Sequence, residues 1–214
     1  MRRRSAAGPA AASRSTAAIG SAAIAFAALI GGCKSDSALS STGSRGASSA
    51  APAQSSALPA ARDELHQGVR FLVNFRGGAD ERSPLVIAIH GRGDTPDHFA
   101  RLFQDFNARA ELAWPQAPER YSDGFSWFPG SRGMTETELA ASMDAAEKRL
   151  WPAIAELARG RRVFVTGFSQ GGMLSYVLAA RHPIEIAYAF PIAGGAPRAL
   201  LPHGRAPAAP IYAL

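Results

Sequence analysis

The chain has 214 residues, 47% hydrophobic and 19% charged, which is enough for one globular domain with a sizeable core. Its net charge of +6 includes four arginines near the start, Arg2, Arg3, Arg4 and Arg14, so the rest carries only +2 and no nucleic-acid partner is expected. The single cysteine, Cys33, excludes an internal disulfide and a cysteine-based metal cluster.

Residues 1–32 have the features of a bacterial lipoprotein signal peptide. A basic start, MRRR, precedes about 14 mostly apolar residues, fewer than the ~20 that a membrane-spanning helix needs. The run Ile30-Gly31-Gly32-Cys33 resembles a lipobox, although Ile30 stands where leucine is usual. We therefore expect a lipidated Cys33 that attaches the protein to a membrane of the bacterial cell envelope. A free secreted form and an uncleaved anchor are the alternatives.

Residues 33–62 are rich in Ser, Ala, Gly and Pro and contain almost nothing that could form a core. This composition predicts a disordered tether. The folded domain is then expected to occupy residues 63–214.

The first half of this domain is predicted to alternate strands and helices. GVRFLVNFRGG (68–78) reads as an edge strand, and the apolar run PLVIAI (84–89) as a central parallel strand covered on both faces. A helix over 97–110 places phenylalanines on one stripe. A short strand over 111–118 and a glycine- and aromatic-rich loop over 121–133 follow.

The second half continues this alternation. Residues 134–160 form a long helical stretch, with a bend or break near Leu150 caused by Pro152 and a C-cap at Gly160. A strand and helix over 163–182, an apolar strand over 184–195, a loop and a last strand over 210–214 complete the chain. Strands that alternate with helices indicate a doubly wound, mostly parallel α/β sheet.

The stretch Val163–Gly172 (VFVTGFSQGG) carries the strongest functional signal. A β-branched strand runs into G-x-S-x-G, and a helix-forming segment follows at once, which is the context of a nucleophile elbow. The flanking glycines leave room for a strained turn that exposes a hydroxyl. We therefore predict Ser169 as a catalytic nucleophile; an ordinary glycine-rich turn is the alternative.

The loop His90-Gly91-Arg92-Gly93 follows the PLVIAI strand, where a serine hydrolase draws its second oxyanion amide. The predicted oxyanion hole consists of the backbone N–H groups of Arg92 and Gln170. His90 is expected to orient the loop rather than move a proton. An ordinary glycine turn, or an integrin-type RGD motif, would be the alternative explanation.

Several of these motifs together resemble the phospholipase/carboxylesterase family of α/β-hydrolases, which includes acyl-protein thioesterases. They are PLVIAIHGRGDTPDHF, PQAPER, SWF and VFVTGFSQGGMLSYVLAARHP, in that order. The resemblance implies a three-layer α/β-hydrolase fold, a Ser-His-Asp triad and hydrolysis of small-molecule carboxylic esters or thioesters, without cofactor or metal. It places Trp127 and Phe128 in the substrate cleft, with loop packing as the alternative, whereas Pro129 stands where many relatives carry an acid.

The triad acid and base are harder to place. In this fold they follow the serine in the order acid, histidine, but the only carboxylate after Ser169 is Glu185 and the histidines are His182 and His203. None of these fits, and His182 is expected to interact with the end of its helix instead. We therefore expect the acid and base beyond Leu214, a sheet without its last strands and helix, and an inactive fragment.

The leading hypothesis is thus a lipid-anchored serine esterase. Within the enzyme class, a feruloyl-esterase or polyester-depolymerase type is a competitor. Outside it, the alternative is a non-catalytic lipoprotein that uses the hydrolase scaffold as a binding module.

Overall fold

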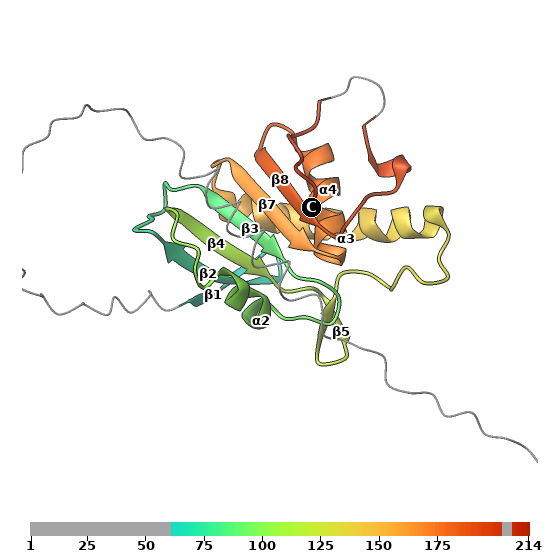
Figure 1. Ribbon diagram of the computed structural model, residues 1–214, viewed down its shortest axis with the longest axis horizontal. Helices are drawn as coiled ribbons and strands as arrows, with labels where there is room; N and C mark the ends of the chain where they lie inside the picture. The colour runs from blue at the N-terminus through green and yellow to red at the C-terminus, as the bar shows by residue number, and fades with distance from the viewer. Residues whose placement is uncertain (1–60, 203–206) are drawn as a thin grey trace, which may run out of the picture.

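The computed structural model describes residues 61–202 and 207–214 (Figure 1). The predicted signal peptide, Cys33 and nearly all of the predicted tether lie outside these residues. The described chain forms a six-stranded sheet and a separate two-stranded hairpin. In spatial order the sheet strands are β1 (Arg62–His66), β2 (Val69–Arg76), β4 (Ala110–Pro115), β3 (Leu85–Ile89), β7 (Val163–Phe168) and β8 (Ile186–Ile192).

The mostly parallel sheet is confirmed, because β4, β3, β7 and β8 run parallel while β1 and β2 are antiparallel. β3 lies at the centre, and its five apolar residues are all buried. The prediction of an edge strand over 68–78 is wrong: β2 lies inside the sheet, and β1 forms the edge. β1 was not predicted from its sequence, RDELH, because this segment is mostly charged and an exposed edge strand needs no continuous apolar face.

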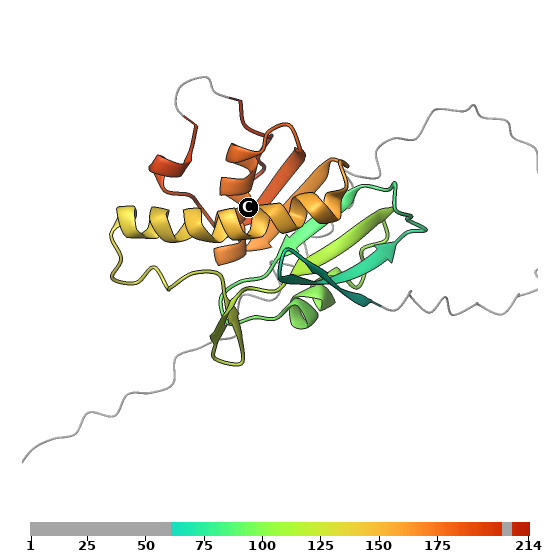
Figure 2. The same ribbon diagram turned by 180° about the vertical axis from the view of Figure 1, so that it is seen from behind.

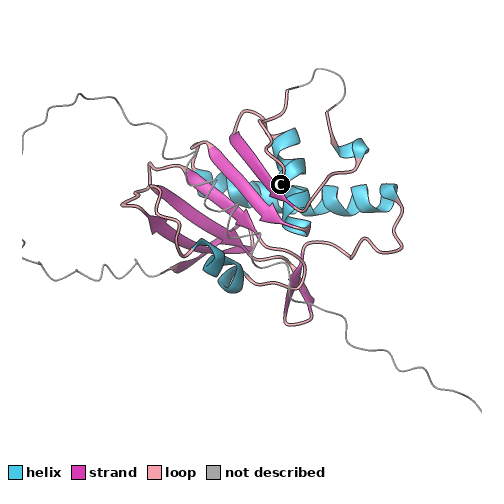
Figure 3. Cartoon of the chain, in the orientation of Figure 1, coloured by secondary structure: helices cyan, strands magenta, loops and turns pink. Residues whose placement is uncertain are grey.

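Helices cover both faces of the sheet (Figure 3). α3 (Glu136–Ala158) and α4 (Gln170–Arg181) pack on one face, and α2 (Pro96–Ala100) packs on the other. Figure 2 shows α3 lying along the sheet as one long element. Pro152 lies inside α3 without splitting it, and the C-cap is Arg159, in the left-handed region at φ 51°, one residue before the predicted Gly160.

The predicted helix over 97–110 is much shorter in the structure. α2 ends at Ala100 and continues only as a 3-10 turn, η1 (Arg101–Phe103). The stripe of phenylalanines is nevertheless buried, at Phe99, Phe103 and Phe106. The helix stops early because β4 begins at Ala110, and the turn before it packs closely on Gly77, where a Cβ would overlap the Asn107 carbonyl. The helical spacing of apolar residues in the sequence extends beyond Ala100, where the chain reverses direction, and it therefore predicted a helix that is too long.

Two predicted loops contain regular structure, and the last predicted strand pairs with β8. The aromatic loop holds the hairpin β5 (Glu119–Tyr121) and β6 (Gly124–Ser126), and the loop after β8 holds a 3-10 turn, η2 (Arg198–Leu200). Residues 210–214 run parallel beside β8, with Ile211 bridged to Ala189. None of the helices formed by the described residues is long and apolar enough to cross a membrane.

Candidate active site

Ser169 lies at the turn between β7 and α4, with φ 54° and ψ −114°. Positive φ is costly for a residue with a side chain and persists only where the surroundings impose it. A Cβ at Gly171 would overlap the Ile89 carbonyl oxygen, and one at Gly167 would overlap the Gly171 backbone. The two glycines of the motif are therefore required by close packing of β7, α4 and β3.

The backbone of Ser169 is fixed while its hydroxyl is left free. Its N–H donates to the Ile192 carbonyl at 3.0 Å, and its own carbonyl accepts from the Met173 N–H at 2.9 Å. Ser169 occupies the N-cap position of α4 but makes no side-chain capping hydrogen bond. The hydroxyl therefore remains available to a ligand, in a half-buried position.

The loop after β3 lies directly against this turn. A Cβ built at Gly91 would be 3.6 Å from the Ser169 Cβ. The loop's own hydrogen bonds run from the Gly93 N–H to the Phe125 carbonyl and from the Asp94 N–H to the Gly91 carbonyl, and no partner for the Arg92 N–H occurs among the described residues. Gln170 is the first residue of α4, so its N–H lacks an intrahelical acceptor. Both predicted oxyanion donors therefore flank Ser169 with unused N–H groups.

His90 organises this loop. It is fully buried, its Nδ1–H donates to the Gly91 carbonyl at 2.7 Å, and its Nε2 accepts from the Ala117 N–H at 3.3 Å. Burial lowers the pKa of His90 below its ordinary value and favours the neutral ring that these two hydrogen bonds require. The Trp127 indole N–H donates to the His90 carbonyl at 2.9 Å. This geometry fits the expectation that His90 orients the loop.

The side chain of Gln170 ties the aromatic loop to the elbow. Its Oε1 accepts from the Trp127 N–H at 3.0 Å, and its Nε2 donates to the Phe128 carbonyl at 2.7 Å. Trp127 and Phe128 are only 5% and 3% exposed and belong to the core. Neither lines the hollow beside Ser169. The packing expected as their alternative role is thus present, and their contact with substrate stays a prediction.

A cleft of about 470 Å³ opens beside Ser169. Its lining combines the elbow, the oxyanion loop and charged side chains, namely Gly91, Arg92, Gly93, Asp94, Thr95, His98, Asp123, Phe168 and Ser169. Sequence reasoning missed Asp94, His98 and Asp123. Asp94 Oδ1 lies 2.7 Å from His98 Nδ1, one helical turn further along the chain. The i, i+4 spacing at the start of a helix was the available signal for this pair.

The structure places two other residues considered for catalysis, Glu185 and His182, away from Ser169, whereas the third, His203, lies outside the described residues. The Glu185 carbonyl accepts from the N–H of Val163, the first residue of β7, whereas Ser169 follows its last residue. His182 Nε2 is 2.6 Å from Glu147 Oε1, and its ring stacks on Trp151 with centroids 3.6 Å apart. His182 thus connects the C-terminal end of α4 to α3. No group of three His, Cys, Asp or Glu suited to a metal ion occurs in 61–202 or 207–214.

Comparison with known proteins agrees with this arrangement. The model of the family "Phospholipase/Carboxylesterase" matches residues 75–200. "Putative esterase NocK" of Nocardia uniformis subsp. tsuyamanensis is 30% identical over 142 residues, covering 62% of this chain and 40% of that protein. The crystal structure of esterase PE8 superposes with a TM-score of 0.51 at 21% identity, covering 59% of this chain and 64% of the other, and shows the fold alone.

This chain therefore spans about two fifths of the length of NocK and just under two thirds of PE8. The matched range 75–200 includes β3, the oxyanion loop, β7 and the Ser169 elbow. The expected α/β-hydrolase fold is confirmed by the sheet and by these relatives. The chain belongs to the phospholipase/carboxylesterase family of α/β-hydrolases.

Proposed function

We propose that the protein is a serine hydrolase that cleaves small-molecule carboxylic esters or thioesters through an acyl-enzyme on Ser169. One observation carries this proposal: the strained, uncapped Ser169 at φ 54° lies against a loop and a helix start that both present free N–H groups. Membership of an esterase family supports the same activity class.

The mechanism follows from this geometry. The Ser169 Oγ attacks the substrate carbonyl carbon, its proton passes to a general base, and the carbonyl oxygen becomes an oxyanion. The N–H groups of Arg92 and Gln170 stabilise that charge, assisted by the positive end of the 12-residue helix α4. The base returns that proton to the leaving alcohol or thiol. Water then gives a proton to the base, attacks the acyl-enzyme and releases the acid, and the base returns the proton to Ser169.

Proton transfer from Ser169 needs a base, and neither His182 nor Glu185 can provide it from its position. Among the described residues, His98 is the histidine that lines the Ser169 cleft, where Asp94 holds its Nδ1. The described residues therefore leave the triad base unassigned, and losing the base of a triad costs several powers of ten in rate.

A fluorophosphonate probe tests the proposal. We expect covalent labelling of one serine, mapped to Ser169 by peptide mass spectrometry and abolished in Ser169→Ala. Ser142→Ala is the matched control, since its hydroxyl lies on the exposed side of α3 and bonds only the Glu138 carbonyl in the structure. Labelling that persists in Ser169→Ala would show that a serine other than Ser169 is the nucleophile. No labelling at all would favour a non-catalytic binding module.

Lipid anchoring is a separate proposal that rests on residues 1–33. The basic start, short apolar run and lipobox-like Ile30–Cys33 support lipidation of Cys33 and a location on the bacterial cell envelope. The intact mass of the membrane-bound protein should correspond to a chain that begins with diacylglyceryl-modified Cys33. Cys33→Ala should shift the protein out of the membrane fraction, and a wild-type protein found without lipid would contradict the proposal.

A further inference from the structure

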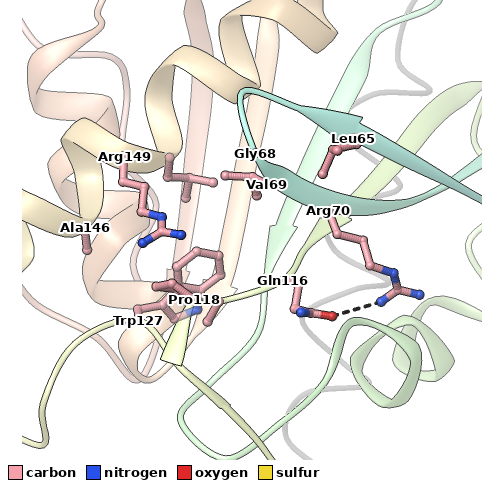
Figure 4. Close-up of a pocket in the computed structure, with 11 residues that line it drawn as sticks. Leu65, Gly68, Val69, Arg70, Gln116, Pro118, Trp127, Ala146 and Arg149 are labelled. Carbon is pink, nitrogen blue, oxygen red and sulfur yellow. Dashed lines mark hydrogen bonds between the residues drawn. The ribbon is translucent and has the colours of Figure 1, made fainter. Parts of the chain in front are cut away.

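A second hollow, of about 190 Å³, lies between the β1–β2 hairpin, the segment after β4, and α3 (Figure 4). It shares no lining residue with the Ser169 cleft. Val69, Leu150, Pro118 and the indole of Trp127 provide apolar walls. The hollow is therefore a distinct site in which apolar walls stand beside polar side chains.

One charged group points into this hollow without a partner. Arg149 extends from α3 toward Trp127 (Figure 4), and no ion pair or hydrogen bond of its side chain occurs among the described residues. The other cation at the hollow, Arg70, is already engaged: it lies 2.6 Å from Asp63 Oδ1 and donates to Gln116 Oε1 at 3.2 Å. Arg149 is thus the guanidinium available to an anion at this site.

The size and the charge of the site together define a ligand class. A protein cavity of roughly 150 Å³ is known to hold one benzene ring, so this hollow accommodates a single ring or a short aliphatic body. A guanidinium matches a carboxylate in planar, two-point geometry, and the hydrogen bonds are strengthened by both charges. An apolar wall beside one free arginine favours a small hydrophobic acid over a sugar or a polyphosphate.

We propose that this hollow binds a small monocarboxylate with a ring-sized apolar body. The carboxylate pairs with Arg149, and the ring packs against Val69, Leu150 and the face of Trp127. This site is independent of chemistry at Ser169, so it can be tested whether or not the esterase proposal holds.

Benzoate and its neutral isostere benzamide serve as probes, with the full chain and with ligand-observed NMR and tryptophan fluorescence as readouts. We expect saturable binding of benzoate, and binding of benzamide that is at least about tenfold weaker, because it lacks the charge that Arg149 pairs with. Arg149→Gln should weaken benzoate binding by about tenfold and leave benzamide unchanged.

Lys148→Gln is the matched control, because it removes the same charge one residue away at a side chain that pairs with Asp144 and does not line the hollow. It should bind benzoate like the wild type. Absence of saturable binding, equal affinities for benzoate and benzamide, or equal losses in the two variants would each overturn the proposal. If Arg149→Gln does not fold, the comparison of the two ligands on the wild type still decides.

Discussion

The two long helices that cover the same face of the sheet begin in opposite ways. The N-cap of α3 is Thr135, whose extended backbone and hydroxyl complete a capping box with Glu138. The N-cap of α4 is Ser169, which also carries a hydroxyl but has φ 54° and makes no side-chain capping bond. The hydroxyl of Thr135 is consumed in holding its helix, whereas that of Ser169 is left free.

The difference between the two N-caps shows how the strained turn leaves the Ser169 hydroxyl free. A relaxed N-cap satisfies the first helical N–H groups with its own side chain. Ser169, at positive φ, makes no such side-chain bond to them, and it lines the cleft together with the loop after β3. The strain is offset by close packing of Gly167 and Gly171 on neighbouring backbone. One helix start therefore provides stability, and the other provides the arrangement that we propose for catalysis.

The largest effect should come from filling the space at the start of α4. A methyl group at Gly171 overlaps the Ile89 carbonyl, which belongs to the central strand and cannot move easily, so Gly171→Ala should lower the free energy of unfolding by at least about 3 kcal/mol. Thr137→Ala, at the equivalent exposed position of α3, should change it by less than about 0.5 kcal/mol. Urea unfolding measures both, and similar costs would show that the two helix starts are equally tolerant.

The far end of α4 should show the next largest effect. The buried Glu147 carboxylate lies 2.7 Å from Arg181 Nη1 and 2.6 Å from His182 Nε2. Glu147→Gln should cost about 1–3 kcal/mol, less than a fully buried pair because both partners are partly exposed. A Glu147→Gln protein as stable as the wild type at pH 7 would show that this cluster does not hold α4 in place.

The same cluster predicts a pH dependence. Burial alone would raise the pKa of Glu147, but the hydrogen bonds from His182 and Arg181 outweigh it and hold the pKa below its ordinary value of 4.5. The unfolded chain then binds more protons, so the contribution is complete above about pH 4.5 and is lost as pH falls through the lower folded-state pKa. The stability gap between wild type and Glu147→Gln should therefore shrink as pH falls below about 4.5. A gap that widens below this pH would contradict the prediction.

Removing the cap of α3 should have a moderate effect on stability and none on Ser169. Thr135→Ala loses the hydrogen bonds between its hydroxyl and Glu138, which should cost about 1 kcal/mol in thermal or urea unfolding. Fluorophosphonate labelling of the folded protein should remain at the wild-type rate. A loss of labelling without unfolding would mean that the two helix starts are coupled.

Ser169→Ala should give the smallest change in stability and so completes the comparison. Its hydroxyl makes no capping bond, so the free energy of unfolding should stay within about 0.5 kcal/mol of the wild type. If Ser169→Ala lowers the free energy of unfolding as much as Thr135→Ala does, then Ser169 acts as a structural cap, and the contrast between the two helix starts is wrong.

Local sequence was sufficient wherever close backbone packing demanded particular residues. The run VFVTGFSQGG predicted a strand, a tight turn and a helix, which the structure has as β7, Ser169 and α4. The apolar PLVIAI likewise predicted the buried central strand β3. In both cases the information lies in consecutive residues, because glycine at a positive φ or a close contact, and an unbroken β-branched run, constrain the backbone directly.

Only the tertiary structure decided which side chains meet. In the folded chain the charged segment Arg62–His66 forms the edge strand, and α2 ends at Ala100, before β4 begins. The side chain of Gln170 accepts a hydrogen bond from the Trp127 N–H. The tertiary structure also brings the Asp94–His98 pair to the Ser169 cleft. Such contacts depend on strand order and on where the chain reverses, which long-range packing sets, so no run of neighbouring residues could contain them.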